Sequence, residues 1–250
     1  MLTPDQATSE ITRLIEQAIV TQPRSLQRTI GPSEIGNPCD HCLAARLAGW
    51  EKHEVETPWV TVIGTSVHAW LEKAFNRLDP EHTRFLTEAR VKVGQIGSTD
   101  IWGSTDLLDM QTGMTVDWKI VGDNSLRIYR TGPSPVYRTQ AHLYAKGWND
   151  TGIRVDTVSI YFLPRNRQMR HGYWWHEPYQ PDLAAAALAR ANHIQRQLDA
   201  LTTVSIATRD KWITTLPRAD GCWDCRRYPD KPAHKDPLNI ATEREVKNHD

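Results

Sequence analysis

Apolar residues recur every three or four positions in several stretches of the chain, the spacing that places them on one face of an α-helix. This spacing predicts helices over residues 3–20, 40–48, 65–78, 136–148 and 181–201. The helix over 65–78 has the clearest apolar stripe, formed by Val67, Trp70, Leu71, Ala74, Phe75 and Leu78. Each of these helices therefore has one side suited to packing against another layer.

Strands are predicted where β-branched and aromatic residues follow one another between glycine-containing turns. Such runs cover residues 85–93, 100–110, 114–121, 155–163 and 172–176. Residues 21–38, 51–60 and 122–135 are expected to form loops, and the tail after residue 202 is expected to end frayed. The order helix, three strands, helix, strand favours a mixed α/β (α+β) layered fold over a doubly wound parallel sheet.

Length and charge limit the possible classes of protein. The 250 residues suit a single domain, here 1–250 with a core of about 60–202. Thirty basic residues balance thirty acidic ones, which excludes a generally polybasic binder. The sequence contains no long uncharged apolar run and no secretory signal, so we expect a cytoplasmic protein that does not enter the membrane.

Two neighbouring strands bring acidic groups together. Asp117 and Lys119 lie two apart on one predicted strand and so share a face, and Asp106 lies on the strand before the Gly113 turn. Neighbouring carboxylates repel unless a cation lies between them, which suggests Mg²⁺ or Mn²⁺ with a further oxygen from the Trp118 carbonyl. Lys119 would then act on the attacking water. Taken alone, an Asp-x-Lys pair is weak evidence, because it arises by chance in most chains of this size and usually marks a surface cross-pair.

Several further motifs accompany this pair in a fixed order between residues 64 and 144. They are Gly64-Thr-Ser-Val-His68, Gly103-x-x-Asp106-Leu-Leu, Asp117-x-Lys119 and Gln140-x-x-x-Tyr144. Together they resemble the RecB-like branch of the P-D-(D/E)-x-K nucleases, close to the CRISPR-associated RecB-like exonucleases of phage type. Ser33-Glu-x-Gly36-x-x-Cys39 is similar to the start motif of many such enzymes.

The resemblance implies a restriction-endonuclease-like αβββαβ core and a metal-dependent DNA exonuclease of phage or bacterial recombination, repair or replication. It assigns the metal to His68, Asp106, Asp117 and the Trp118 carbonyl, and the remaining catalytic roles to Lys119, Gln140 and Tyr144. Glu88 is either a supplementary carboxylate or an exposed partner of Arg90 or Lys92. The alternative function is a non-catalytic nucleic-acid-binding or adaptor module with a degenerate nuclease fold.

Basic and aromatic residues cluster around the proposed site in the sequence. The basic residues are Arg127, Arg130, Arg138, Lys146, Arg165 and Arg167, and the aromatic ones are Tyr129, Tyr137, Trp174 and Trp175. They would contact phosphates and stack on unpaired bases of DNA with a single-stranded end. A solvated charge cluster over core aromatics is the alternative. Recombination or replication proteins are further expected partners.

The four cysteines form two C-x-x-C pairs, Cys39 with Cys42 and Cys222 with Cys225. In a reducing compartment such pairs suit a metal better than disulfides. One site would join the N-terminal segment 1–59 to the C-terminal segment 203–250. The resemblance implies a [4Fe–4S] cluster, although the family typically has one N-terminal and three C-terminal cysteines, and zinc suits a two-plus-two set.

Overall fold

The computed structural model describes residues 3–20, 30–53, 59–228 and 230. Its chain divides into two compact units, one built from 1–37 and 56–192 and the other from 38–55 and 193–250. Helix α7 (Pro181–Val204) contributes to both units. Within the described ranges, no helix combines the length and the apolar character needed to cross a membrane.

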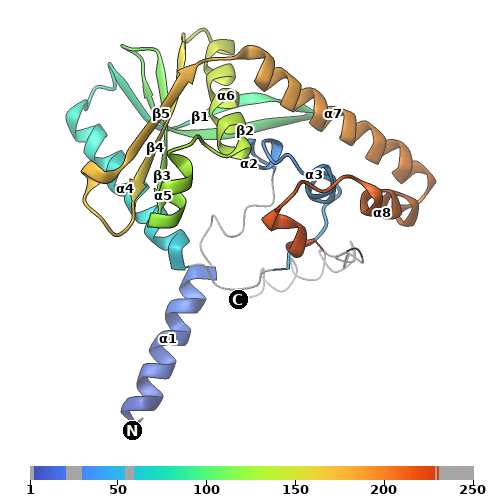
Figure 1. Ribbon diagram of the computed structural model, residues 1–250, viewed down its shortest axis with the longest axis horizontal. Helices are drawn as coiled ribbons and strands as arrows, with labels where there is room; N and C mark the ends of the chain where they lie inside the picture. The colour runs from blue at the N-terminus through green and yellow to red at the C-terminus, as the bar shows by residue number, and fades with distance from the viewer. Residues whose placement is uncertain (1–2, 21–29, 54–58, 229, 231–250) are drawn as a thin grey trace, which may run out of the picture. The chain divides into compact units, whose positions relative to one another are not determined.

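The first unit is built on a mixed five-stranded sheet (Figure 1). Its strands are β1 (Phe85–Ile96), β2 (Thr99–Asp109), β3 (Met114–Val121), β4 (Thr157–Pro164) and β5 (Tyr173–Pro178). They lie in chain order, and β3 runs parallel to β4 whereas the other neighbours are antiparallel. A parallel pair needs a long crossover, and α5 (Asp123–Tyr129) and α6 (Pro135–Asp150) supply it.

Helices cover both faces of this sheet. On one face, Leu71 and Phe75 of α4 (Trp59–Leu78) pack against buried Leu107, Val116 and Trp118. On the other face, α5 and α6 pack their aromatic residues against buried Ile160 and Phe162. Trp118 and Lys119 are consecutive on β3 and therefore point to opposite faces. Lys119 is consequently on the α5–α6 side, where its register partner is Phe162.

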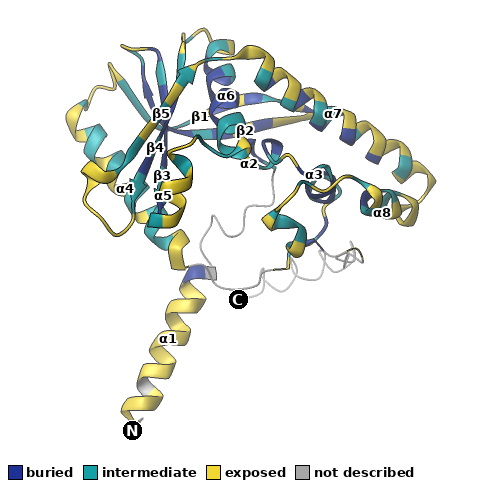
Figure 2. Ribbon diagram, viewed as in Figure 1, coloured by how far each residue is buried: buried dark blue, intermediate teal, exposed yellow. Residues whose placement is uncertain are grey.

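Two shorter elements complete the first unit. The single-turn α2 (Pro32–Ile35) packs against α6, where a side-chain carbon at Gly36 would lie 2.7 Å from the Val136 carbonyl oxygen. The α7 residue Arg190 donates to the carbonyl of Ile35 at 2.9 Å. Helix α1 (Pro4–Val20) exposes its apolar stripe, including Ile11 (Figure 2).

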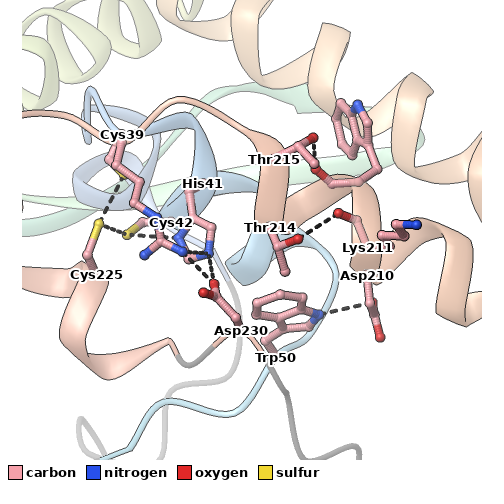
Figure 3. A network of polar contacts seen from close by, with 12 residues as sticks. Cys39, His41, Cys42, Trp50, Asp210, Lys211, Thr214, Thr215, Cys225 and Asp230 are labelled. Atoms are coloured by element: carbon pink, nitrogen blue, oxygen red, sulfur yellow. Dashed lines mark hydrogen bonds and ion pairs between the residues drawn. The ribbon is translucent and has the colours of Figure 1, made fainter.

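The second unit is helical. It contains α3 (Asp40–Leu47), the end of α7, α8 (Ile206–Thr215) and the 3₁₀ turn η3 (Trp223–Arg227). Leu43, Ile213 and Tyr228 are fully or almost fully buried there. The Trp50 indole donates to Asp210 Oδ1 at 3.1 Å, as Figure 3 shows. This bond links the segment after α3 to α8.

The structure confirms the predicted mixed fold and the αβββαβ core that the RecB-like resemblance implies. The loop prediction for 122–135 is wrong over α5, and the tail prediction missed α8. Ser205 caps α8 by accepting the Thr208 N–H at 3.0 Å. On α4, Trp70 and Leu78 are exposed, so only part of its predicted stripe packs on the sheet.

Candidate metal centre and active site

Asp106 and Asp117 occupy facing positions of β2 and β3, where the ladder between these strands stops. On this side, the paired part of the β2–β3 ladder ends with Leu107 opposite Val116. One step further, the Trp118 backbone N–H donates to Asp106 Oδ2 at 2.7 Å. The Asp106 carboxylate thus takes a backbone donor of β3, and both carboxylates are almost fully buried. Burial of two acids side by side is costly unless positive charge accompanies them.

His68 reaches the same point from α4. Its Nε2 lies 3.1 Å from the Trp118 carbonyl oxygen, and its Nδ1 lies 3.3 Å from Asp106 Oδ1 and 3.5 Å from Glu88 Oε1. Burial alone would lower the pKa of His68, but the two carboxylates outweigh it and raise that pKa to about 9. In the absence of another cation, the imidazolium therefore supplies positive charge to the carboxylates.

Glu88 adopts an unusual backbone conformation to join this group. Its φ is 45°, in the left-handed region that side chains other than glycine rarely adopt. The ladder between β1 and β2 pairs the residues on either side of it, Thr87 with Leu107 and Ala89 with Thr105. Ser104 Oγ donates to Glu88 Oε2 at 3.1 Å. Glu88 thus faces the acidic cluster, which is the position that a supplementary carboxylate requires.

Lys119 pairs with the second carboxylate. Its Nζ lies 2.5 Å from Asp117 Oδ2 and 4.7 Å from the centre of the Tyr137 ring. Burial raises the pKa of Asp117 to about 6, Lys119 opposes this rise and Asp106 adds to it. Beyond this ion pair, Asp117 Oδ2 accepts no other hydrogen bond within the described part of the chain. Its remaining lone pair has capacity for a further positive ligand.

The donor set fits a hard divalent ion. One ligand atom each from His68, Glu88 and Asp106 lies within 4.8 Å of the others. His68 Nδ1 is the ring nitrogen that faces the two carboxylates and would share an ion with them, whereas Nε2 faces the Trp118 carbonyl oxygen at 3.1 Å. Carboxylate, carbonyl and imidazole ligands suit Mg²⁺ and Mn²⁺. The structure thus brings together His68, Asp106 and Trp118, with Glu88 as an additional acid.

Gln140 and Tyr144 lie on α6, as expected, and contact each other. Gln140 Nε2 donates to the Tyr144 hydroxyl at 2.9 Å. The buried Tyr144 ring covers Gly103, where a side-chain carbon would lie 2.4 Å from Tyr144 Cε1. The ring found against Lys119 is that of Tyr137, for which the sequence suggested only base stacking.

The expected DNA-binding residues have varied surroundings. Three form ion pairs with carboxylates: Arg138 with Glu177, Lys146 with Asp150 and Arg167 with Asp123. The other three lie in the connections that flank β3 and β4. There Arg130 donates to the His171 carbonyl, Arg127 to Asn124, and Arg165 reaches over Gly122. The guanidinium groups of Arg127 and Arg130 thus have neutral hydrogen-bond partners.

The four aromatic residues that were expected to stack on bases also differ in their exposure. Tyr129 stacks on Phe162 at a centroid distance of 4.4 Å, and Trp175 packs on the same buried cluster. Trp174 is 45% exposed and stacks on Tyr161 at 4.2 Å. Of the four proposed stacking platforms, Trp174 is the one with an exposed ring surface.

The four cysteines meet in the second unit. The sulfur atoms are separated by 3.5 Å (Cys39–Cys225), 3.6 Å (Cys42–Cys225) and 3.7 Å (Cys42–Cys222). His41 is completely buried beside them, with Nδ1 3.9 Å from Cys42 Sγ (Figure 3). All four thiols are free of disulfides. The two pairs thus form one cluster that fits the predicted staple.

No family model and no curated protein matches this sequence. Among solved structures, the chain is similar to an alkaline exonuclease from Laribacter hongkongensis, with 14% identity, 69% of this chain and 89% of that chain covered, and a TM-score of 0.46. The same enzyme is matched in complex with dAMP at 15% identity, with the same coverage and TM-score. A phage-related exonuclease from Haemophilus somnus matches with 12% identity, 64% and 80% coverage, and a TM-score of 0.43.

Proposed function

We propose that this chain is a divalent-metal-dependent DNA exonuclease. The observation that carries the proposal is the position of His68, whose two ring nitrogens lie against the Trp118 carbonyl and the Asp106 carboxylate. On either side of Trp118 in β3, the buried Asp117 carboxylate forms an ion pair with the partly buried Lys119 ammonium group. Acids, an imidazole and an ammonium group gathered at one point of a sheet suit hydrolysis of a phosphodiester.

The residues of the site would perform two tasks, and the first is to hold the metal ion. His68, Asp106, Asp117 and the Trp118 carbonyl would hold Mg²⁺ or Mn²⁺, with Glu88 as a further acid. Such an ion polarises a phosphoryl oxygen and makes a water molecule more acidic. Glu88 and Asp106 lie on β1 and β2, whose pairing fixes their spacing, so these ligands are preorganised.

Lys119 carries the second task. Its ammonium group is held between Asp117 and the Tyr137 ring, which fixes it on the α5–α6 face of the sheet. From there it would donate hydrogen bonds to the attacking water and to the phosphate as negative charge grows on the oxygens. Gln140 and Tyr144, which bond to each other, would maintain the α6 surface beside this group.

The substrate would be DNA with a single-stranded end. Arg127 and Arg130, which donate to neutral partners, and Arg165 beside Gly122 are suited to phosphate contacts, and exposed Trp174 is suited to stacking on a base. Arg138, Lys146 and Arg167 would have to exchange a carboxylate partner for a phosphate. Phage or bacterial recombination, repair or replication in the cytoplasm would use such an activity.

The four cysteines would serve the fold rather than the chemistry. They bind a metal that joins the Cys39–Cys42 segment to the Cys222–Cys225 segment within the second unit. A [4Fe–4S] cluster, as the resemblance implies, and zinc are the two candidates. Either would stabilise the folded chain because the ligands are brought together only on folding.

Digestion of linear DNA in Mg²⁺ or Mn²⁺, compared with EDTA, tests the proposal. We expect metal-dependent release of nucleotides by the wild-type protein and at least a hundredfold loss in Asp117→Asn and Lys119→Ala. Asp100→Asn is the matched control, because Asp100 is a half-exposed β2 carboxylate paired with Lys92 away from the cluster. Circular dichroism verifies that each variant is folded.

Two results would contradict the nuclease. Wild-type rates in Asp117→Asn or Lys119→Ala would remove these residues from the chemistry. DNA binding without any cleavage in Mn²⁺ would favour the non-catalytic adaptor module. The intact set of Asp106, Asp117 and Lys119 argues against that module, because a binding protein has no need to bury these charges.

A further inference from the structure

We propose that the four cysteines bind a single zinc ion, and that the [4Fe–4S] cluster which the family resemblance implies does not fit this site. The inference is independent of the nuclease activity, because it concerns only the described residues of the second unit, 38–53, 193–228 and 230. It assigns four thiolate ligands, Cys39, Cys42, Cys222 and Cys225, and excludes His41 from the ligand set.

The distances between sulfur atoms carry the first step. Around one tetrahedral zinc, with Zn–S distances of about 2.3 Å, neighbouring sulfur atoms are about 3.8 Å apart. The three sulfur–sulfur separations of 3.5, 3.6 and 3.7 Å approach this edge and connect all four thiols in a continuous chain. In a four-iron cluster each thiolate binds its own iron, and the core of irons and sulfides holds the thiolates much further apart.

The local backbone supports two chelating pairs on one ion. Cys39 is the N-cap of α3, and Cys42 lies in its first turn. Cys222 is likewise the N-cap of η3, and Cys225 lies within that turn. Each pair therefore presents its two sulfur atoms from a single turn of the chain. Two equivalent pairs complete one tetrahedral set.

His41 is the competing fourth ligand, because one of its ring nitrogens lies within 4.8 Å of the Cys39, Cys42 and Cys225 sulfur atoms. Two groups face its Nε2: Arg218 Nη2 at 3.2 Å, which can only donate a hydrogen bond, and Asp230 Oδ1 at 3.6 Å, which is beyond ordinary hydrogen-bond distance. The nearer group makes His41 Nε2 the acceptor and leaves the proton of the neutral ring on Nδ1. That N–H points to Cys42 Sγ at 3.9 Å as a donor to the thiolate.

Arg218 would also offset part of the charge of the site. Four thiolates and one Zn²⁺ carry a net charge of minus two, which is costly beside buried side chains. The Arg218 guanidinium is held in place by Asp230 Oδ1 at 2.5 Å, and through His41 it extends donors towards the sulfur atoms. Partners of this kind orient metal ligands and tune their basicity.

Metal analysis of the full chain, purified anaerobically from cells supplied with both iron and zinc, tests the proposal. We expect about one zinc per chain, little iron and no broad absorption near about 400 nm. Replacement of the zinc by Co²⁺ should give the intense visible bands of a tetrahedral cobalt–thiolate site. A brown protein with stoichiometric iron and acid-labile sulfide would overturn the inference, and so would a folded protein that binds neither metal.

Two variants test the choice of ligands. Cys222→Ser should lower the zinc affinity at least tenfold in competition with a chromophoric chelator, and its cobalt derivative should show weaker sulfur-to-metal charge transfer. His41→Gln should keep one zinc per chain and the four-thiolate cobalt spectrum. Loss of zinc in His41→Gln together with full retention in Cys222→Ser would establish a three-cysteine, one-histidine site instead. Neither readout depends on DNA cleavage, so this inference and the proposed nuclease can fail separately.

Discussion

His68 Nδ1 lies 3.3 Å from Asp106 Oδ1, although the two residues belong to different layers of the fold, a helix and the sheet it covers. The Trp118 backbone connects them a second time, because its carbonyl oxygen faces His68 Nε2 and its N–H bonds to Asp106. One peptide segment of β3 is therefore fixed from both sides. A change in the packing of α4 would be transmitted directly to the position of the carboxylates.

The strained backbone at Glu88 should be measurable as stability. Glu88→Gly and Glu88→Ala both remove the carboxylate, so they differ only in how well the backbone accepts a positive φ. Glu88→Gly should be more stable by about 1 kcal/mol, because glycine adopts a positive φ without steric cost. Urea unfolding gives the two free energies of unfolding. Arg90 on the same strand has no positive φ and is the matched control, where the alanine variant should be the more stable. Equal stabilities of the two Glu88 variants would show that no strain is stored there.

Gly103 should tolerate no side chain. Gly103→Ala would place a carbon 2.4 Å from Tyr144 Cε1 and 2.8 Å from Pro32 Cγ, and we expect a loss of about 1–3 kcal/mol in the free energy of unfolding. Gly64→Ala on α4 is the control, because nothing lies within 4 Å of the added carbon and alanine favours the helix by about 0.5–1 kcal/mol. Thermal unfolding of both variants provides the comparison. A Gly103→Ala protein as stable as Gly64→Ala would refute the close approach.

Asp79 should make stability depend on acidic pH. Its carboxylate accepts the backbone N–H groups of Arg84 and Phe85 at 2.8 Å and that of Thr83 at 3.2 Å, and these bonds lower the pKa of Asp79 to about 2. Because the folded pKa is lower than the ordinary value of 3.8, the stabilisation is complete above about pH 4 and is lost as the pH falls towards 2.

Asp79→Asn isolates this contribution. The stability difference between wild type and Asp79→Asn, measured by urea unfolding from pH 7 to pH 3, should be constant down to about pH 4 and should shrink below it. Asp156→Asn, which removes an exposed carboxylate on another loop, is the control measured in parallel. A difference for Asp79→Asn that stays constant down to pH 3 would contradict the depressed pKa.

The sheet could be predicted from the sequence because its strands are bounded by glycine and proline. The predicted strand over 114–121 coincides with β3, and the turn at Gly113, with φ of 63°, joins it to β2 as expected. Helix α5 was missed because seven residues between Gly122 and Gly132 carry no apolar stripe long enough to show a period. Helix α8 was missed for a similar reason, since its burial depends on packing of Ile213 within the second unit.

The acidic site was predicted in part. Alternation on β3 placed Asp117 and Lys119 on one face, and the turn at Gly113 brought Asp106 next to them. Sequence patterns could not show the positive φ of Glu88 or the contact of Tyr137 with Lys119, because both depend on long-range packing. Ion pairs of Arg138 and Arg167 with distant acids were equally hidden, since their partners lie on other elements.

Binding of Mn²⁺, followed through the loss of the free-ion electron paramagnetic resonance signal, tests most directly whether these side chains form a divalent-metal site. We predict saturable binding by the wild-type protein, at least tenfold weaker binding by His68→Asn and Asp106→Asn, and unchanged binding by the control Asp100→Asn. Equal affinities in all four proteins would contradict the central claim, because the ion would then be held by other residues or not at a defined site.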